Sequence, residues 1–361
     1  MSTPTSAGRL QHRFTAGLAE LPLACFGVVM ATGIISISAH LLALPRIARA
    51  LFHLNLLLYA TLWLLTILRA ARWPMRMVGD LVDHLRAPGA FTTVAGTSVV
   101  GSQFVLLYAG HSGGFLFWFA ALALWLILTY VIFALLTLKQ DKPTLESGIN
   151  GSWLLAVVAT QSIVTLGALL APHASAIWQG ELFFVILAMW LSSGMLYIWI
   201  MGLIIYRYLF FRLDAAELSP SYWINMGAMA ISTLAGCLLI ANAGNSLFPH
   251  TMLPFIEGLT LFYWATGTWW IPMLLLLGIW RYGYRRYPLR YVAAYWSAVF
   301  PLGMYAACTE QLASVMHFEF LLPLARVFLY LALFAWTLTS VGLLHHLWQR
   351  LAARAPQATP G

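Results

Sequence analysis

The chain has 361 residues, of which 61% are hydrophobic and only 8% are charged. A composition this apolar is typical of integral membrane proteins and argues against a soluble enzyme or binding domain. The formal net charge of +8 would suit a nucleic-acid-binding protein, but the positions of the basic residues, described below, argue against that function.

Ten stretches are each long and apolar enough to cross a bilayer, since a spanning helix needs roughly 20 apolar residues to cross about 30 Å of hydrocarbon. Only helices or closed barrels satisfy backbone polar groups in lipid, and runs of this length do not alternate as strands do. We therefore predict an all-α polytopic membrane protein with ten transmembrane helices. The predicted spans are 21–43, 51–69, 91–110, 114–137, 151–171, 182–207, 223–243, 253–280, 291–311 and 322–348.

The predicted spans pair into five hairpins of similar length. The loops on one side are short, such as 110–113, whereas the links on the other side are longer and charged, such as 69–90. Repeats that share one in-then-out topology are expected to surround a common axis. We predict a ten-span transport domain over 21–348 with a quasi-five-fold central pore, flanked by cytoplasmic tails at 1–20 and 349–361.

Basic residues gather on one side of this ten-span arrangement. Of the 19 Lys and Arg residues, only Arg46 and Arg49 fall in a loop on the other side, and Arg326 falls inside the last span. The positive-inside rule then places both tails in the cytoplasm, in a multi-pass protein of a bacterial-type inner (plasma) membrane. The basic balance is therefore a topology signal, and no nucleic-acid partner is expected. No removable signal peptide is expected either, because the first apolar run is a full span without a clear cleavage site.

The two spans of a hairpin differ in chemistry. Span 91–110 is rich in Gly, Ser and Thr, whereas the run 115–136 contains one Ser or Thr residue, Thr129, and no glycine. Small and hydroxyl residues let helices approach closely and offer donors without charge, while bulky apolar faces suit lipid. The contrast recurs in four of the five hairpins, span 253–280 being the exception. It predicts an inner ring of odd-numbered spans and an outer ring of even-numbered spans; the alternative is that Gly, Ser and Thr only mark helix contacts.

The central parts of the odd-numbered spans contain no Asp, Glu, Lys, Arg or His. A neutral path lined by hydroxyls and helix dipoles can pass small anions at modest selectivity, because such donors solvate negative charge without trapping it. Some of the glycines are expected to bend the inner helices and widen the path, with close packing as the alternative. The pore-lining candidates are Thr32, Gly33, Thr93, Gly96, Thr97, Thr160, Gln161, Gly227, Ser232 and Gly303.

Other classes of function have less support in the sequence. It contains no Walker-type, dinucleotide-binding or nucleophile-elbow motif, so we expect no enzyme, no cofactor and no metal. A membrane redox protein is the alternative from another class. Its haem site would need paired histidines at similar depth in the membrane. His40 and His53 near one end, and His345 and His346 near the other, are better interpreted as interfacial polar residues.

Several segments resemble one transporter family. They are MATGIISIS in the first span, FTTVAGTSVVG in the third, KPTLESGINGSWLLAVVATQS into the fifth, EGLTLFYWATGTWWIPML in the eighth and WSAVFPLG in the ninth. Together, over about 21–348, they resemble the tellurite-resistance/dicarboxylate transporter family, which includes bacterial tellurite-resistance proteins, fungal malate permeases and plant slow anion channels. The resemblance implies five hairpins around a quasi-five-fold axis and a homotrimer with one pore in each subunit.

The same resemblance implies a gate. In that family a phenylalanine just before a proline-kinked segment of the ninth span plugs the pore, and the matching pair here is Phe300 and Pro301. A proline inside a helix removes a hydrogen bond and kinks the helix, which can aim the preceding side chain inward.

The sequence thus predicts a transmembrane anion channel or facilitative transporter, with small anions and the lipid bilayer as its partners. A pore wall without charged residues does not identify one anion as the substrate. Four-carbon dicarboxylates and tellurite-related oxyanions are therefore both candidates. The alternative within transport is a proton-coupled dicarboxylate carrier of the malate type. A cationic site inside the membrane would favour that carrier, and Arg326 is the residue to consider.

Overall fold

The structure is a computed structural model that describes residues 15–244 and 250–352. Within these ranges, every regular element is helical. The predicted tails at 1–20 and 349–361 lie largely outside the described residues. The chain is an all-α polytopic membrane protein, as its long apolar runs predict.

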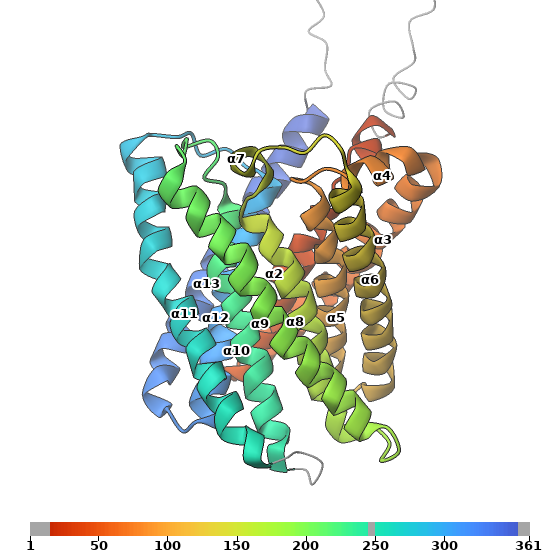
Figure 1. The fold of residues 1–361 in the computed structure, drawn as a ribbon, viewed down its shortest axis with the longest axis vertical. Helices are drawn as coiled ribbons and strands as arrows, with labels where there is room; N and C mark the ends of the chain where they lie inside the picture. The colour runs from red at the N-terminus through yellow and green to blue at the C-terminus, as the bar shows by residue number, and fades with distance from the viewer. Residues whose placement is uncertain (1–14, 245–249, 353–361) are drawn as a thin grey trace, which may run out of the picture.

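The long helices of the described ranges form five consecutive hairpins (Figure 1). The first helices of the hairpins are α2 (Gly27–Leu41), α5 (Phe91–Tyr108), α8 (Leu155–Leu170), α10 (Ile224–Ala241) and α12 (Trp296–Val315). The second helices are α3 (Pro45–Arg72), α6 (His111–Leu138), α9 (Gln179–Phe210), α11 (Leu253–Ile279) and α13 (Leu322–Ala352). The two helices of each hairpin pack against each other.

The first helices of the five hairpins contact one another in a closed ring. Each touches the next along the chain, and α12 returns to α2. The spans that contain α2, α5, α8 and α10 have 72–94% of their most apolar window buried, against 17–50% for those of the second helices. The inner and outer layers therefore follow the Gly/Ser/Thr contrast of the sequence. We call α2, α5, α8, α10 and α12 the inner helices and the other five the outer helices.

A 3₁₀ turn precedes every inner helix, which is a common way to start a helix. These turns also contact one another in a closed ring. They cover Leu23–Phe26 (η1), Ala87–Ala90 (η2), Gly151–Leu154 (η3), Pro220–Trp223 (η5) and Ala293–Tyr295 (η9). We call this end of the bundle the basic end, because the charged links between hairpins meet it. The start of the described chain and the end of α13 both lie there (Figure 1).

Nine helices of the described residues are long and apolar enough to cross a membrane. The remaining predicted span corresponds to α12. The polar residues Thr309, Glu310 and Gln311 interrupt its apolar stretch. This helix is packed among α2, α10 and α13. Its crossing of the bilayer as a tenth span stays a prediction.

The other differences from the predicted spans are at helix ends. The second span begins at Pro45 rather than 51, because proline at the first helical position is pre-set for a helix and loses no hydrogen bond. Two short helices, α4 (Pro74–Leu81) and α7 (Leu145–Gly148), lie in links for which the sequence predicts no helix.

Candidate functional site

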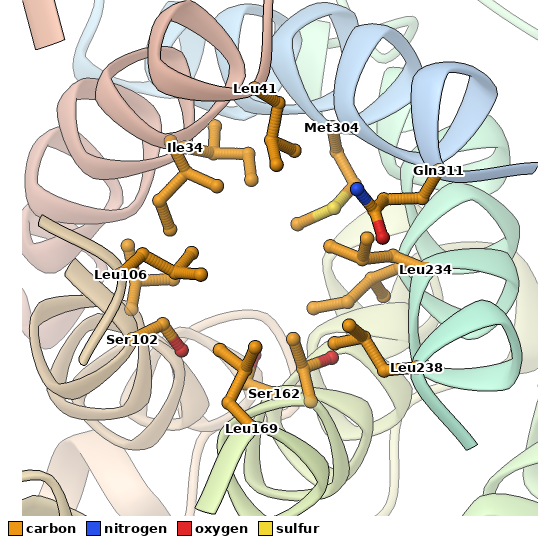
Figure 2. Close-up of a pocket in the computed structure, with 14 residues that line it drawn as sticks. Ile34, Leu41, Ser102, Leu106, Ser162, Leu169, Leu234, Leu238, Met304 and Gln311 are labelled. Atoms are coloured by element: carbon orange, nitrogen blue, oxygen red, sulfur yellow. The ribbon is translucent and has the colours of Figure 1, made fainter. Parts of the chain in front are cut away.

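A cavity of about 70 Å³ lies inside the ring of inner helices. Side chains from all five inner helices point toward this space (Figure 2). One water needs roughly 10–15 Å³ of such volume, so the cavity has room for several waters or a small anion. The lining residues are Ile34, Ile37, Leu41, Val99, Ser102, Leu106, Ser162, Thr165, Leu169, Ile231, Leu234, Leu238, Met304 and Gln311.

The cavity wall follows one spacing around the ring. In α2 the lining residues are separated by three and then four positions, and α5, α8 and α10 repeat that spacing. In α12 the lining residues Met304 and Gln311 are seven positions apart. Residues three, four and seven apart lie on one helix face. Each inner helix therefore turns an equivalent face to the cavity.

The cavity wall is neutral, since none of the fourteen lining residues is charged. Its three hydroxyls donate to carbonyls four residues earlier in their own helices: Ser102 to Ser98 at 2.9 Å, Ser162 to Val158 at 2.7 Å and Thr165 to Gln161 at 2.9 Å. A hydroxyl can rotate and give its hydrogen to another acceptor. An anion in the cavity would have to draw these hydrogens away from the carbonyls, so the wall offers negative charge only weak, exchangeable donors.

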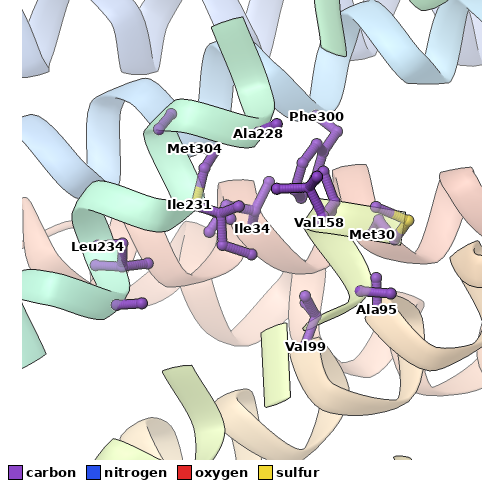
Figure 3. Packing of buried hydrophobic residues seen from close by; sticks show 14 of the residues in the cluster. Met30, Ile34, Ala95, Val99, Val158, Ala228, Ile231, Leu234, Phe300 and Met304 are labelled. Carbon is purple, nitrogen blue, oxygen red and sulfur yellow. The ribbon is translucent and has the colours of Figure 1, made fainter. Parts of the chain in front are cut away.

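Phe300 lies one helical turn from the cavity, toward the basic end. It precedes the lining residue Met304 by four positions on α12, so the two side chains share a helix face. Its ring is 2% exposed and packs in the cluster shown in Figure 3. Four positions before the first lining residue, the other inner helices carry non-aromatic residues: Met30, Ala95, Val158 and Gly227. Phe300 is thus the aromatic side chain at this level of the ring.

Pro301 packs against Gly227 on the neighbouring inner helix α10. A Cβ atom added at residue 227 would lie 2.7 Å from Pro301 Cγ, closer than real contacts of that kind. Inside α12, Pro301 has no N–H to donate to the carbonyl of Ser297. These two predicted residues therefore meet at a close approach of α10 and α12, directly beside Phe300.

The predicted hydroxyl and amide candidates lie on inner helices, but their contacts run to helix neighbours rather than into the cavity. Two outer-helix tryptophans donate their indole N–H to these hydroxyls: Trp336 to Thr32 at 2.9 Å, and Trp125 to Thr160 at 2.7 Å. The remaining contacts join Thr97 to Tyr59 and Thr93, Thr93 to the Ala90 carbonyl, Gln161 to the Trp190 carbonyl, and Ser232 to Ala228 and Trp190. A pore-lining role for these residues stays a prediction.

Three of the four predicted glycines, Gly33, Gly227 and Gly303, lie at close approaches between helices. A Cβ atom at Gly33 would overlap the Val99 side chain, and one at Gly303 would lie 3.0 Å from Ile34. The nearest atom to a Cβ at Gly96 belongs to Val29, at 3.4 Å. Packing between adjacent inner helices accounts for Gly33 and Gly303, whereas a side chain at residue 96 would make only ordinary contacts. Their role in bending helices stays a prediction.

The cavity residues themselves were missed by reasoning that weighted polar side chains. They share a spacing of three and then four positions in four inner helices. Any face of a helix offers that spacing, so it does not single out these residues in the sequence.

The histidines considered as haem ligands have separate partners. His53 shares a hydrogen bond with Tyr108 at 3.1 Å, and His345 with Gln349 at 2.8 Å. The ring of His346 packs against Tyr291. In the part of the chain that the structure covers, no group of three or more His, Cys, Asp or Glu side chains could hold a metal ion.

Residues 20–344 match the sequence profile of a family described as voltage-dependent anion channel. The chain belongs to that family. This match confirms the family resemblance carried by the motifs of the odd-numbered spans and the eighth span.

Two relatives of similar length are transporters by name, and a third, shorter relative is named a membrane protein. An uncharacterized transporter of Methanocaldococcus jannaschii is 27% identical over 88% of this chain and 92% of its own length. A second uncharacterized transporter of that organism is 25% identical over 88% of this chain and 90% of its own length. An uncharacterized membrane protein of Mycobacterium tuberculosis is 38% identical over 42% of this chain and 77% of its own length. Family and architecture together make this protein a membrane anion transporter or channel.

Proposed function

We propose that this anion channel family member conducts small anions along the axis of its inner helices, down their electrochemical gradient, with Phe300 as the gate. The observation that carries the proposal is the position of Phe300, one helical turn from a neutral cavity lined by all five inner helices. Pro301 supports the role, because its contact with Gly227 fixes α12 against α10 beside the ring.

The gate would work by excluding water. At the level of Phe300 the described side chains are apolar and at most 2% exposed, as for Met30 and Val158. An anion crossing such a neck must shed part of its hydration, which costs several kcal/mol without new partners. Beyond the neck, the hydroxyls of Ser102 and Ser162 offer the first exchangeable donors. Movement of the Phe300 ring would therefore control conduction.

The neutral wall supports small monovalent anions as the main substrates. A four-carbon dicarboxylate carries two charges, and none of the fourteen lining residues is a cation that could pair with them. Dicarboxylates and tellurite-related oxyanions remain candidates to be measured against chloride and nitrate.

One observation favours a second candidate, a proton-coupled carrier. Gln311 lines the cavity and donates to the carboxylate of Glu310 at 2.8 Å. Glu310 is therefore a titratable group next to the cavity, at the end away from Phe300. Anion flux into liposomes, measured with and without an imposed pH gradient, tests both candidates. The channel predicts flux without the gradient, whereas a strict proton requirement that Glu310→Gln abolishes would establish the carrier.

The assembly and orientation complete the proposal. We propose ten spans with both tails in the cytoplasm of an inner membrane, and a homotrimer with a pore in each subunit. The outer helices carry exposed apolar side chains, including Leu116, Leu276 and Phe334 at 63–71% exposure, that suit lipid or a neighbouring subunit. Mass measurement of the protein in nanodiscs tests the trimer, and a stable monomer or dimer would contradict it.

A further inference from the structure

Three outer helices carry a buried arginine at one equivalent position near the basic end. Arg69, Arg207 and Arg281 are 1%, 4% and 7% exposed. Each lies three residues before the end of its helical segment: the first two in α3 and α9, and the third in the π-helical turn Trp280–Tyr284 that continues α11. The surroundings of Arg281 can therefore be compared with those of the two equivalent arginines, Arg69 and Arg207.

Two of these cations have an acidic partner. Arg69 pairs with Asp80 at 2.7 Å, and Arg207 pairs with Glu217 at 3.2 Å. Across residues 15–244 and 250–352, no carboxylate forms an ion pair with Arg281. A buried cation is costly unless it is paired and hydrogen-bonded. Arg281 therefore lacks the counter-charge that its equivalents possess.

The protein gives Arg281 only neutral partners. Its guanidinium donates to the carbonyl of Leu218, while its Nε–H is buried without a partner. The guanidinium carbon lies 4.4 Å from the ring centre of Tyr287 and 5.1 Å from that of Tyr282. Aromatic faces stabilise a cation in part, but they leave the Nε–H at the edge of the guanidinium without an acceptor.

Arg281 also lines a cavity of about 90 Å³ between the end of α11 and the turns η5 and η9. Aromatic side chains, including Trp223 and Tyr295, and the aliphatic Leu274 and Leu277 complete the wall. The outer surface of α11 beside it is apolar, with Leu276 63% exposed. The cavity therefore combines a buried cation, aromatic rings and a lipid-facing apolar surface at the basic end of the bundle.

We propose that Arg281 and this cavity bind a phosphate group, such as that of an anionic phospholipid headgroup. The planar guanidinium presents parallel N–H donors that match phosphate oxygens, and basic pockets between membrane helices suit lipid headgroups. The π-helical turn supports the site, since such turns in α-helices are frequent at functional positions. A bound phosphate would supply the negative charge that Asp80 and Glu217 supply to the equivalent arginines.

Binding can be measured on the full chain in a neutral detergent without any flux assay, so the result does not depend on the proposed channel activity. Thermal unfolding is followed by tryptophan fluorescence while short-chain phosphatidylglycerol, short-chain phosphatidylcholine or inorganic phosphate is added. A saturable rise in Tm with phosphatidylglycerol alone identifies an anionic lipid headgroup. A saturable rise with inorganic phosphate identifies a free phosphate as the occupant.

Two variants then locate the site. Arg281→Gln removes the cation, and Gly278→Leu fills the cavity while leaving Arg281 in place, because nothing lies within 4 Å of a Cβ atom at residue 278. Each has a matched control, on the same helix or just past its end. Arg285→Gln removes an exposed cation four residues away, and Gly258→Leu adds the same side chain at another open position.

We expect both site variants to raise the half-saturating concentration of the phosphate compound at least about tenfold, and both controls to stay within about twofold of wild type. Gly278→Leu keeps the test decisive if Arg281→Gln fails to fold. Unchanged binding in Gly278→Leu, an equal loss in the controls, or an equal response to phosphatidylcholine would overturn the proposal.

Discussion

Gly227 on α10 and Pro301 on α12 meet at a close approach of the two inner helices beside Phe300. A Cβ atom at residue 227 would lie 2.7 Å from Pro301 Cγ and 3.0 Å from Pro301 Cβ. The proline ring is rigid, so it cannot yield to a larger neighbour as a flexible side chain would. The identity of residue 227 therefore sets the distance between α10 and α12 at the proposed gate.

This contact predicts that Gly227→Val destabilises the protein. The added side chain must push α12 away from α10, and overpacking of this kind costs typically 1–3 kcal/mol. Thermal unfolding in detergent should show a lower Tm for this variant. Gly202→Val is the matched control, because nothing lies within 4 Å of a Cβ atom at residue 202 on the outer helix α9. Equal Tm shifts in the two variants would contradict the tight contact.

Much of the architecture could be predicted from the sequence because it depends on composition along each helix. The difference between the Gly/Ser/Thr-rich run at 91–110 and the bulky run at 115–136 predicts which helix is inside, and the burial of α5 and α6 follows it. Span ends were less predictable. The early start of α3 at Pro45 and the extra helix α4 depend on local backbone preferences in links that carry little apolar signal.

The rotation of each inner helix about its own axis could not be predicted in the same way. An inner helix is apolar or small on every face, so its sequence does not mark the face that lines the cavity. Thr32 and Thr160 are polar, yet their hydroxyls accept hydrogen bonds from Trp336 and Trp125 of outer helices. The packed arrangement of the five inner helices, and not the sequence of any one of them, distinguishes these packing positions from the cavity positions.

The cavity hydroxyls predict a second mutational effect. Ser102→Ala with Ser162→Ala should lower anion flux roughly five- to 150-fold, because each hydroxyl can contribute about 0.5–1.5 kcal/mol as a donor to an anion and the double variant removes two. Folding should be little changed, since both hydroxyls bond only to their own helices. Thr266→Ala is the control, because its exposed hydroxyl makes the same bond on α11. Unchanged flux in the double variant would argue against the cavity as part of the path.

The hairpin topology predicts opposite labelling of two exposed positions. Ser112 lies at the start of α6, and Lys142 follows its other end. Cysteines introduced at these two positions should react with a membrane-impermeant reagent from opposite sides, with position 142 on the cytoplasmic side. Labelling of both from the same side would contradict the predicted crossing of α6.

The central claim is that the ring of Phe300 closes the path for anions. The most direct measurement is anion flux into liposomes containing Phe300→Ala, normalised to the amount of folded protein, with Phe119→Ala on the lipid-facing side of α6 as the control. A gate predicts that Phe300→Ala raises flux above wild type while Phe119→Ala leaves it unchanged, because removing the ring opens a neck that water can enter. A packing role predicts a loss of roughly 3–5 kcal/mol of stability without any gain in conduction. Flux equal to or below that of the wild-type protein would contradict the assignment of Phe300 as the gate.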